Sequence, residues 1–341
     1  TRVVEPDVPA HGSTNTRGTI LIPDSSWRPV DRPILTDLVP VPRVWQRMEA
    51  VERRLLEVTE SDDEFLTDIA QHLLRAGGKR YRPLLAQVAA EFGPSTGSGP
   101  VEAGVSVELV HVGSLYHDDV IDEAESRRGE VSVNENWSNT IAILAGDFLL
   151  ARASEVAAPL GEEAVALIAQ TYARLCEGQI AELRLANSLD HGAEGYFRVI
   201  GGKTASLIRT AARLGALTAG SDSETVDAIS DWAWEMGLVF QMTDDVLDLI
   251  ADDEFLGKPA GSDIGEGTFT LPVLQAMHGP HGDEIRTLLG NGKPYPTSAV
   301  ERVIEIVRDG GYVTAVLDEV HARLDAAREA MSALPDEDVT K

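Results

Sequence analysis

Apolar residues along this chain of 341 residues recur three and four positions apart rather than in alternation. This spacing places them on one face of an α-helix, whereas a half-buried strand would alternate apolar and polar residues. Helix-forming residues are abundant, and aromatic residues make up only 5% of the chain. The pattern therefore predicts an all-α protein.

The first 41 residues depart from this pattern. Prolines, glycines and hydroxyl residues are scattered through them without a sustained period, which predicts an extended or disordered arm over residues 1–41. The helical pattern starts at Pro42, since proline suits the first turn of a helix, and reaches about Val58. A capping-type sequence at residues 61–64 then starts a helix that ends at a Gly-Gly pair. Further helices are predicted over residues 139–151, 161–188, 194–218, 222–250, 266–278 and 297–334.

An apolar helical segment over residues 105–115 leads into a turn that carries three carboxylates, Asp118, Asp119 and Asp122. Asp118 and Asp122 are four residues apart, so they lie on the same face of the helix. Their repulsion is unfavourable unless a cation is bound beside them. A single turn of this kind is also compatible with a solvated helix face.

A second turn repeats the spacing at Asp244, Asp245 and Asp248, again on an apolar helix. Magnesium takes oxygen ligands and is usually held by one or two carboxylates together with substrate phosphates. Two facing Asp turns could therefore clamp a diphosphate through magnesium ions. The pair favours a metal site over two solvated faces, because ionised groups on buried helices require partners.

Two clusters of basic residues lie near these turns in the sequence. Residues 77–83 place three cations beside a Gly-Gly break and ahead of a proline-started helix, which suits a phosphate. The competing interpretation is that these cations complement the dipole of the preceding helix. Arg127 and Arg128 follow the first Asp turn and could pair with its carboxylates or bind phosphate in bidentate fashion.

Composition excludes several classes of partner. The formal charge of −27 disfavours binding to nucleic acid or to anionic lipid, which both need a basic surface. A single cysteine, Cys176, excludes an intramolecular disulfide, and we expect it to be a buried apolar residue. No segment has the roughly 18 uninterrupted apolar residues of a membrane span. We expect a cytoplasmic protein without a transmembrane segment.

Seven motifs stand in an order that resembles the trans-polyprenyl diphosphate synthase family. They are Gly77-Gly-Lys-Arg-Tyr-Arg-Pro, the first Asp turn with Arg-Arg-Gly after it, Leu144-Ala-Gly-Asp147, Gly202-Lys-Thr, Phe240-Gln, the second Asp turn and Leu256-Gly-Lys-Pro. The match spans about residues 42–335. The resemblance implies one large helical domain over residues 42–341 around a central cavity, the isoprenoid synthase fold, and typically a homodimer.

The same resemblance implies a reaction and a set of ligands. Members of the family condense an allylic diphosphate with isopentenyl diphosphate, head to tail, and the departing diphosphate is the usual base. Magnesium would be bound by Asp118, Asp119, Asp122, Asp244, Asp245 and Asp248. The allylic diphosphate would be bound by Arg127, Lys203 and Lys258, with Thr204 and Gln241 nearby. Isopentenyl diphosphate would be bound by Lys79, Arg82, His111 and Arg128. Catalysis is expected to depend on Asp118, Asp119, Asp122, Arg127, Lys203, Asp244, Asp245 and Lys258.

Product length is predicted from the helix before Asp118. In relatives with short products, a bulky aromatic residue four or five positions before the first Asp closes the pocket, whereas this chain has Gly113 and Ser114 there, with Val110 one turn further back. A tunnel could therefore continue along the helix and admit a medium or long product. Alternatively, Gly113 and Ser114 permit close helix packing while a residue such as Phe148 forms the floor, and the product is geranylgeranyl diphosphate.

The chain departs from the family pattern at one position. Relatives often carry a basic residue after the Glu266-Gly267 pair, whereas this chain has Thr268.

Other hypotheses fit the motifs less well. A class I terpene cyclase would usually lack the second Asp turn and the basic residues at 77–83. A noncatalytic regulatory subunit would lose the Asp turns. A catalytic subunit that needs a small partner subunit remains an alternative.

Overall fold

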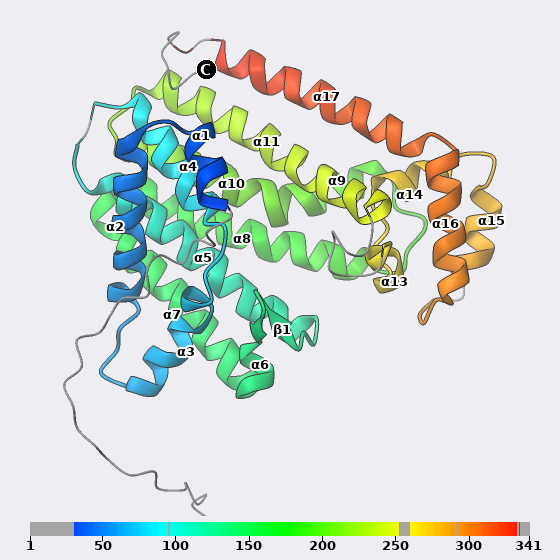
Figure 1. Cartoon of the computed structure of the whole chain (residues 1–341), viewed down its shortest axis with the longest axis horizontal. Coiled ribbons are helices and arrows are strands. Elements are labelled where there is room, and N and C mark those ends of the chain that lie inside the picture. Colours follow the sequence, from blue (N-terminus) through cyan, green and yellow to red (C-terminus); the bar gives the residue numbers. More distant parts are fainter. Residues whose placement is uncertain (1–30, 95, 252–259, 291, 333, 335–341) are drawn as a thin grey trace, which may run out of the picture.

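The computed structural model describes residues 31–94, 96–251, 260–290, 292–332 and 334, and only the backbone of residues 31–34. Within these residues the chain is helical apart from turns and one short hairpin, so the all-α prediction is confirmed (Figure 1). The N-terminal half contains α1 (Asp31–Leu38), α2 (Pro42–Val58), α3 (Glu64–Arg75), α4 (Tyr81–Ala89), η1 (Ala90–Phe92), α5 (Gly99–Ile121), β1 (Ser126–Arg127), β2 (Glu130–Val131), α6 (Val133–Asn136), α7 (Asn139–Ala157) and η2 (Ala158–Leu160). The C-terminal half contains α8 (Glu162–Leu185), α9 (Ala193–Ile200), η3 (Gly201–Ala205), α10 (Ser206–Thr218), α11 (Ser223–Ile250), α13 (Ser262–Glu266), α14 (Leu271–Ala276), α15 (Gly282–Leu289), α16 (Thr297–Asp309) and α17 (Tyr312–Met331).

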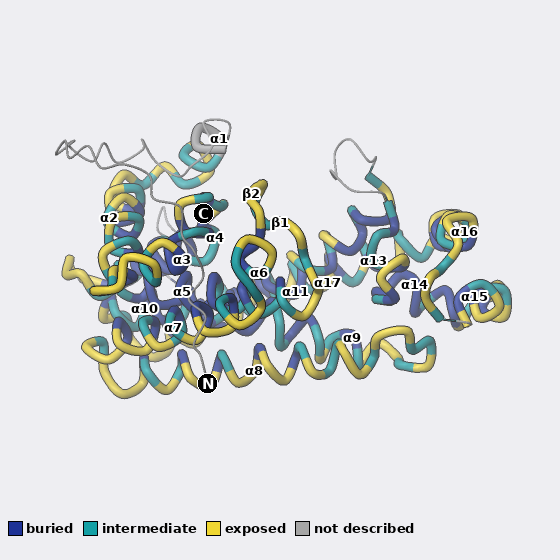
Figure 2. The backbone as a smooth tube through the Cα atoms, turned by 90° about the horizontal axis from the view of Figure 1, so that it is seen from below, coloured by how far each residue is buried: buried dark blue, intermediate teal, exposed yellow. Residues whose placement is uncertain are grey.

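Helix α5 is the centre of the N-terminal half. Its residues are buried on every side, as expected of a helix that is apolar all round. It packs against α7, α4, α10 and α2, whereas α8 lies further out and exposes one side to solvent (Figure 2). This packing places the C-terminal end of α5 at the edge of the core, where Asp119 is buried, Asp118 is half-buried and Asp122 is exposed.

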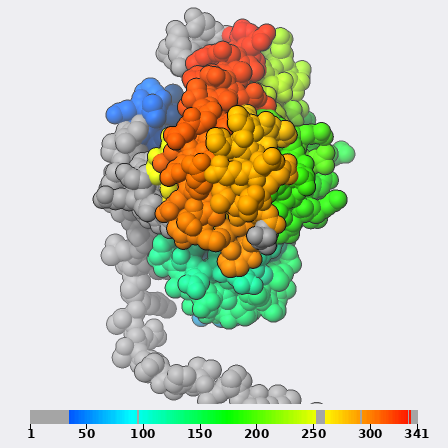
Figure 3. Space-filling view, turned by 90° about the vertical axis from the view of Figure 1, so that its right-hand side faces the viewer, coloured from blue at the N-terminus to red at the C-terminus, as the bar shows by residue number. Residues whose placement is uncertain are grey.

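Helix α11 organises the C-terminal half. It packs against α10 on one side and α17 on the other. A second apolar core forms where its last turns meet α9, α13, α14 and α17, and includes Leu238, Val246 and Leu249. Helices α14, α15 and α16 form one end of the molecule, which faces the viewer in yellow-orange to orange in Figure 3. The second Asp turn therefore also lies at the end of a buried helix.

Several predicted helix starts are confirmed by their caps. Helix α2 starts at Pro42 as expected. The Asp63 carboxylate caps α3 by accepting hydrogen bonds from the N–H groups of Phe65 and Leu66, at 2.9 and 3.3 Å. The Asp222 carboxylate caps α11 by accepting from the N–H of Thr225 at 2.8 Å. These ends were predictable because a cap depends on residues adjacent in the sequence.

Other predictions were wrong in part. Residues 31–38, placed in the arm, form α1, because Leu35 and Val39 pack against the cluster of Val44, Met48 and Leu84. Residues 1–30, which make up the rest of the arm, lie outside the described residues. The segment 266–278 is not one helix but the end of α13 and then α14. Cys176 is exposed rather than buried, because it lies on the outer side of α8.

The interruption expected at Gly202 to Thr204 is a π-helical segment, η3, between α9 and α10. Gly202 lies so close to α8 that a methyl group there would approach Gly178 Cα to 2.8 Å and the Arg174 carbonyl oxygen to 2.9 Å. Facing glycines thus let the two backbones touch. Such π-segments often occur at functional sites, and this one carries Lys203.

Candidate active site

The first Asp turn is held by a hairpin that follows it. Strands β1 and β2 pair antiparallel, and this pairing carries Arg127 back toward the end of α5. The Arg127 guanidinium binds one oxygen of Asp119 through Nε at 2.7 Å and Nη2 at 2.6 Å. Asp119 is fully buried, and its other oxygen has no hydrogen-bond partner among the described residues. A buried carboxylate oxygen left in this state is a suitable ligand for a cation.

The second Asp turn has a different set of partners. The Tyr196 hydroxyl donates a hydrogen bond to Asp245 Oδ2 at 2.6 Å, and Gln241 Nε2 donates to Oδ1 at 2.9 Å. Thr204 holds that amide in turn, because its hydroxyl donates to Gln241 Oε1 at 2.8 Å. The backbone N–H of Asp263 donates to Asp248 at 3.3 Å. Asp244, the first residue of the turn, is exposed.

Segment η3 connects the two turns. Lys203 forms an ion pair with Glu182 of α8, and its positive charge also acts on Asp118 of the first turn. The next residue, Thr204, begins the chain of hydrogen bonds that reaches Asp245 of the second turn. The predicted ligands Asp118, Lys203, Thr204, Gln241 and Asp245 therefore belong to one continuous arrangement.

The carboxyl groups of this arrangement are only partly compensated by the cations and hydrogen-bond donors around them. Burial raises the pKa of Asp118, an effect that Lys203 opposes, and it raises the pKa of Asp119, which Arg127 opposes. Burial also raises the pKa of Asp245 to about 7, against the hydrogen bonds from Tyr196 and Gln241. Each carboxylate would be easier to ionise with a cation beside it.

The donor set fits a hard divalent cation, because it consists of carboxylate oxygens. In the described ranges, no three acidic, histidine or cysteine side chains converge closely enough to hold an ion alone. Magnesium needs fewer protein ligands than that when substrate phosphates supply the rest. The turns therefore fit ions that arrive with a diphosphate.

A second group of predicted ligands lies around the loop between α3 and α4 and the inner side of α5. Lys79 is exposed, whereas Arg82, His111 and Arg128 are half-buried. Burial, reinforced by the charges of Arg82 and Arg128, lowers the pKa of His111 well below its usual value. The imidazole is therefore neutral at pH 7 and can donate one hydrogen bond to an anion. Burial also lowers the pKa of Arg82, whose Nε has no hydrogen-bond partner in the part of the chain that is described.

The residues predicted to set product length lie on α5 where it meets α7. Val110 is fully buried, and the Ser114 hydroxyl donates to the His111 carbonyl at 2.8 Å. A methyl group at Gly113 would lie 3.1 Å from the Gly146 carbonyl oxygen and 3.2 Å from Leu150 Cγ. Gly113 thus permits close packing of the two helices, as the alternative interpretation of the sequence required.

Two glycine-containing motifs now have a physical explanation. A methyl group at Gly146, within Leu144-Ala-Gly-Asp147, would come within 2.3 Å of the imidazole of His117, the residue before Asp118. Gly78 has a φ of +141°, and a methyl group there would lie 2.9 Å from the guanidinium carbon of Arg128. Gly146 therefore leaves room for the side chain before Asp118, and Gly78 leaves room for Arg128, itself a predicted ligand.

Sequence reasoning missed several partners of these ligands, namely Glu108, Glu182, Tyr196 and Asp263. Glu108 could have been found from the sequence, because it is an acidic residue on an apolar helix one turn before His111, and an ionised group there requires a partner. Nothing local in the sequence singled out Tyr196. Lys258 and the rest of Leu256-Gly-Lys-Pro lie outside the described residues.

Comparison with known proteins identifies the family. The model of the polyprenyl synthetase family matches residues 63–307. The nonaprenyl diphosphate synthase of Mycobacterium tuberculosis is 40% identical over 277 residues, which cover 80% of this chain and 82% of the relative. The octaprenyl diphosphate synthase of Escherichia coli is 34% identical over 299 residues, covering 85% and 91%. The chain belongs to the polyprenyl synthetase family.

A solved structure agrees in fold. The geranylgeranyl pyrophosphate synthase of Corynebacterium glutamicum, complexed with calcium and isoprenyl diphosphate, is 40% identical with a TM-score of 0.78, and the match covers 88% of this chain and 92% of that one. The predicted isoprenoid synthase fold is thereby confirmed. The family binds a divalent metal, and this member is a trans-polyprenyl diphosphate synthase, a prenyltransferase of the class expected from the sequence. None of the described helices is long and apolar enough to cross a membrane.

The raised pKa of Asp245 leads to a prediction about stability. In the unfolded chain this carboxyl group loses its proton near its ordinary pKa of 3.8, whereas the folded chain keeps it until about pH 7. The free energy of unfolding of the metal-free protein therefore falls between these two pH values, because the unfolded state releases the proton first. We expect Asp245→Asn to raise the melting temperature at pH 8 but not at pH 4.

Thermal unfolding followed by circular dichroism in the presence of a chelator would measure this difference. Asp62→Asn is the control, since Asp62 is exposed in the loop before α3. An equal effect of Asp245→Asn at both pH values would contradict the assignment of the shift to burial of this carboxyl group.

Proposed function

We propose that this polyprenyl diphosphate synthase condenses an allylic diphosphate with isopentenyl diphosphate, head to tail, and that the two Asp turns bind the allylic diphosphate through magnesium. The observation that carries the proposal is the continuous arrangement from Asp118 through Lys203 and Thr204 to Asp245. These contacts link cationic and carboxylate groups of α5, η3 and α11, and this supports a metal-bridged diphosphate bound among them. Asp119, Asp122, Asp244 and Asp248 complete the proposed ligand set.

The residues divide into two sets with different tasks. Arg127 and Lys203, together with Lys258, would hold the allylic diphosphate as its bond to carbon breaks. Bound magnesium would supply further positive charge against the negative charge that develops on this leaving group. Lys79, Arg82, His111 and Arg128 would hold isopentenyl diphosphate with its double bond directed at the allylic carbon. The proton lost after bond formation passes to the departing diphosphate, so no general base is assigned to the protein.

We expect Asp118→Asn to lower kcat by about a hundredfold or more, because it removes a negative ligand from the first turn. Initial rates with labelled isopentenyl diphosphate, an allylic diphosphate and magnesium would measure the loss. The exposed Asp62→Asn variant should keep the wild-type rate. A chelator should abolish turnover and added magnesium should restore it. Full activity of Asp118→Asn would refute the proposed role of the first turn, and an inactive wild type would favour a missing partner subunit.

The proposed product is a medium or long all-trans polyprenyl diphosphate. Two observations support this length: no aromatic residue occupies positions 113 and 114, and the relatives reported above include enzymes named for eight- and nine-unit products. Leu150 is the side chain nearest to the position of a Cβ at Gly113, and the Phe148 ring has the Arg152 guanidinium 5.0 Å from its centre. We therefore assign to Leu150 the narrowing of the path along α5. Geranylgeranyl diphosphate is the alternative product if this narrowing closes the path.

We expect the wild-type enzyme to make products longer than geranylgeranyl diphosphate and Leu150→Ala to shift them to greater length, because the smaller side chain opens space beside Gly113. Chromatography of dephosphorylated products, starting from farnesyl diphosphate, would show the distribution. Leu317→Ala, which truncates a half-buried leucine of the other core, is the matched control. A wild-type enzyme that stops at geranylgeranyl diphosphate would establish the alternative. An unchanged distribution for Leu150→Ala would place the floor elsewhere.

The protein is further proposed to be a cytoplasmic homodimer. The single cysteine, Cys176, fits a reducing compartment. Helices α7 and α8 pack together and both expose large apolar side chains, with Leu144, Ile180 and Leu183 each more than half exposed. Apolar surface of this kind is typical of subunit contacts.

We expect the wild-type protein to sediment as a dimer and Leu144→Asp to dissociate it, since a buried charge at an apolar contact is unfavourable. Analytical ultracentrifugation would measure the masses. Leu38→Asp, which places the same charge at an exposed leucine of α1, should leave the dimer intact. A monomeric wild type would rule out the homodimer.

A further inference from the structure

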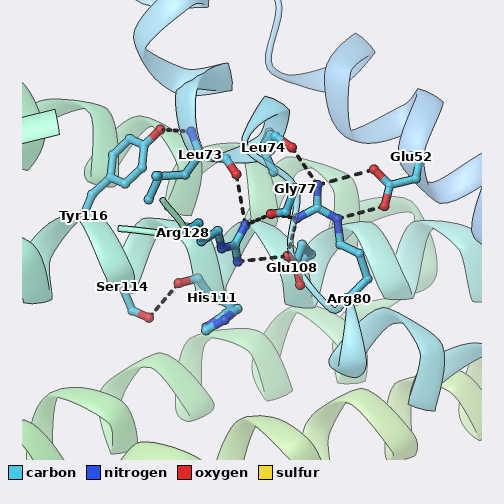
Figure 4. Close-up of polar contacts among 10 residues, drawn as sticks. All are labelled: Glu52, Leu73, Leu74, Gly77, Arg80, Glu108, His111, Ser114, Tyr116 and Arg128. Carbon is cyan, nitrogen blue, oxygen red and sulfur yellow. Dashed lines mark hydrogen bonds and ion pairs between the residues drawn. The ribbon is translucent and has the colours of Figure 1, made fainter. Parts of the chain in front are cut away.

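Arg80 lies among the predicted ligands of isopentenyl diphosphate but has no hydrogen-bond donor left for a substrate. A guanidinium has five N–H donors. Those of Arg80 reach both oxygens of Glu52, at 2.8 and 3.3 Å, Glu108 at 2.9 Å, and the carbonyl oxygens of Leu74 and Gly77 at 2.8 and 3.3 Å (Figure 4). Its side chain is only 1% exposed. Arg80 is therefore fixed inside the protein, whereas the preceding residue, Lys79, is exposed.

Arg128 is fixed by neighbouring acceptors. Its Nη1 donates to the carbonyl oxygen of Leu73 at 2.9 Å and also to that of Gly77. Its Nη2 lies 3.6 Å from Glu108. The Gly77 carbonyl and the Glu108 carboxylate thus each bind both Arg80 and Arg128 (Figure 4). Unlike Arg80, Arg128 keeps donors that none of these contacts uses.

The backbone indicates that these positions are strictly held. Arg80 has a φ of +46° and Arg128 a φ of +57°, both in the left-handed region that residues other than glycine rarely adopt. Such strain persists only where surrounding contacts determine the conformation, and it concentrates at functional sites. The shared acceptors, Gly77 and Glu108, supply those contacts here.

Glu108 faces two arginines of this group and acts on a third. Its carboxylate is 2% exposed and carries a negative charge between Arg80 and Arg128, and the same charge acts on Arg82. His111 lies one helical turn further along α5. Arg80, Arg82 and Arg128 carry three positive charges against the two negative charges of Glu52 and Glu108. One net positive charge is therefore left in this group before Lys79 is counted. This excess is available for an anion.

We propose that Glu108 is the positioning residue of the isopentenyl diphosphate site. It touches no substrate, but it holds Arg128 in the orientation that binds the diphosphate, with Arg80 as a buried clamp and not a ligand, and its negative charge also acts on Arg82. The inference rests on the proposed function, because it assumes that this corner binds isopentenyl diphosphate. It assigns Arg80 and Arg82, two arginines of one motif, to different tasks. The Glu108 carboxylate would by itself repel a bound anion. Its role in holding the cations explains why it lies beside an anion site.

The test is Glu108→Gln, which keeps the shape of the side chain and removes its charge. The Glu108 oxygen that faces both Arg80 and Arg128 can remain an acceptor in the amide, but it no longer carries charge, so Arg128 is held less firmly. We expect KM for isopentenyl diphosphate to rise by roughly tenfold or more, since bonds to charged groups are lost, while KM for the allylic diphosphate stays within about twofold. Glu108→Asp, which keeps the charge, should recover part of the loss.

Glu91→Gln is the matched control. The Glu91 carboxylate is also buried and also binds two arginines, Arg43 and Arg47, but it lies away from both diphosphate sites. It should lower the melting temperature as Glu108→Gln does and leave both KM values unchanged. Lys79→Ala serves as the direct ligand variant and should raise KM for isopentenyl diphosphate.

The outcomes distinguish the positioning role of Glu108 from the assignment of the isopentenyl diphosphate site. A raised KM for isopentenyl diphosphate alone, in Glu108→Gln and Lys79→Ala but not in Glu91→Gln, supports the positioning role. If Lys79→Ala raises that KM and Glu108→Gln does not, Glu108 is only structural and the inference fails. If neither variant changes it, the assignment of the site itself fails. Should Glu108→Gln not fold, isothermal titration of Glu108→Ala with isopentenyl diphosphate decides, and wild-type affinity there would overturn the inference.

Discussion

Carboxylates buried in an apolar helical bundle are the feature on which this active site depends. Ionised groups away from water are costly unless cations or hydrogen bonds compensate them, and each buried acid here has its own partner. Arg127 binds Asp119, the Tyr196 hydroxyl and the Gln241 amide bind Asp245, and Arg80 binds Glu108. The Asp turns are only partly compensated, as their raised pKa values show, whereas Glu108 faces an excess of cations. The Asp turns therefore favour a metal ion, and the cations around Glu108 favour an anion.

Irregular backbone is concentrated where these partners meet. The π-segment η3 projects Lys203 and Thr204 between the two Asp turns, and it exists where Gly178 and Gly202 bring α8 and η3 into contact. Arg80 and Arg128 both adopt left-handed conformations next to Gly77 and Gly78, which do the same. Regular helices thus form the scaffold, and the deviations from regular geometry place the functional side chains. This distribution is expected where a site is over-determined by its surroundings.

The two cores give the site its rigidity. Helix α5 ends at the first Asp turn beside the core of the N-terminal half, and α11 carries the second Asp turn beside the core of the C-terminal half. Helix α10 packs against both α5 and α11, so it connects the two helices that carry the Asp turns. Since neither Asp turn lies on a free loop, their relative positions are set by helix packing. A bridged diphosphate needs this, because small displacements of its ligands weaken both binding and catalysis.

The sequence by itself determined what depends on neighbouring residues. The helical period, the caps at Asp63 and Asp222, and the spacing of both Asp turns were all readable, because a few adjacent positions encode each of them. Tertiary structure alone decided which cations are free. Arg80 and Arg82 are two residues apart and chemically identical, yet Arg80 is saturated by Glu52 and Glu108, each 28 residues away in sequence. Likewise, Tyr196 acquires its role only because α9 packs near the end of α11. Such pairings arise from packing between distant segments, so they cannot be predicted from local periodicity.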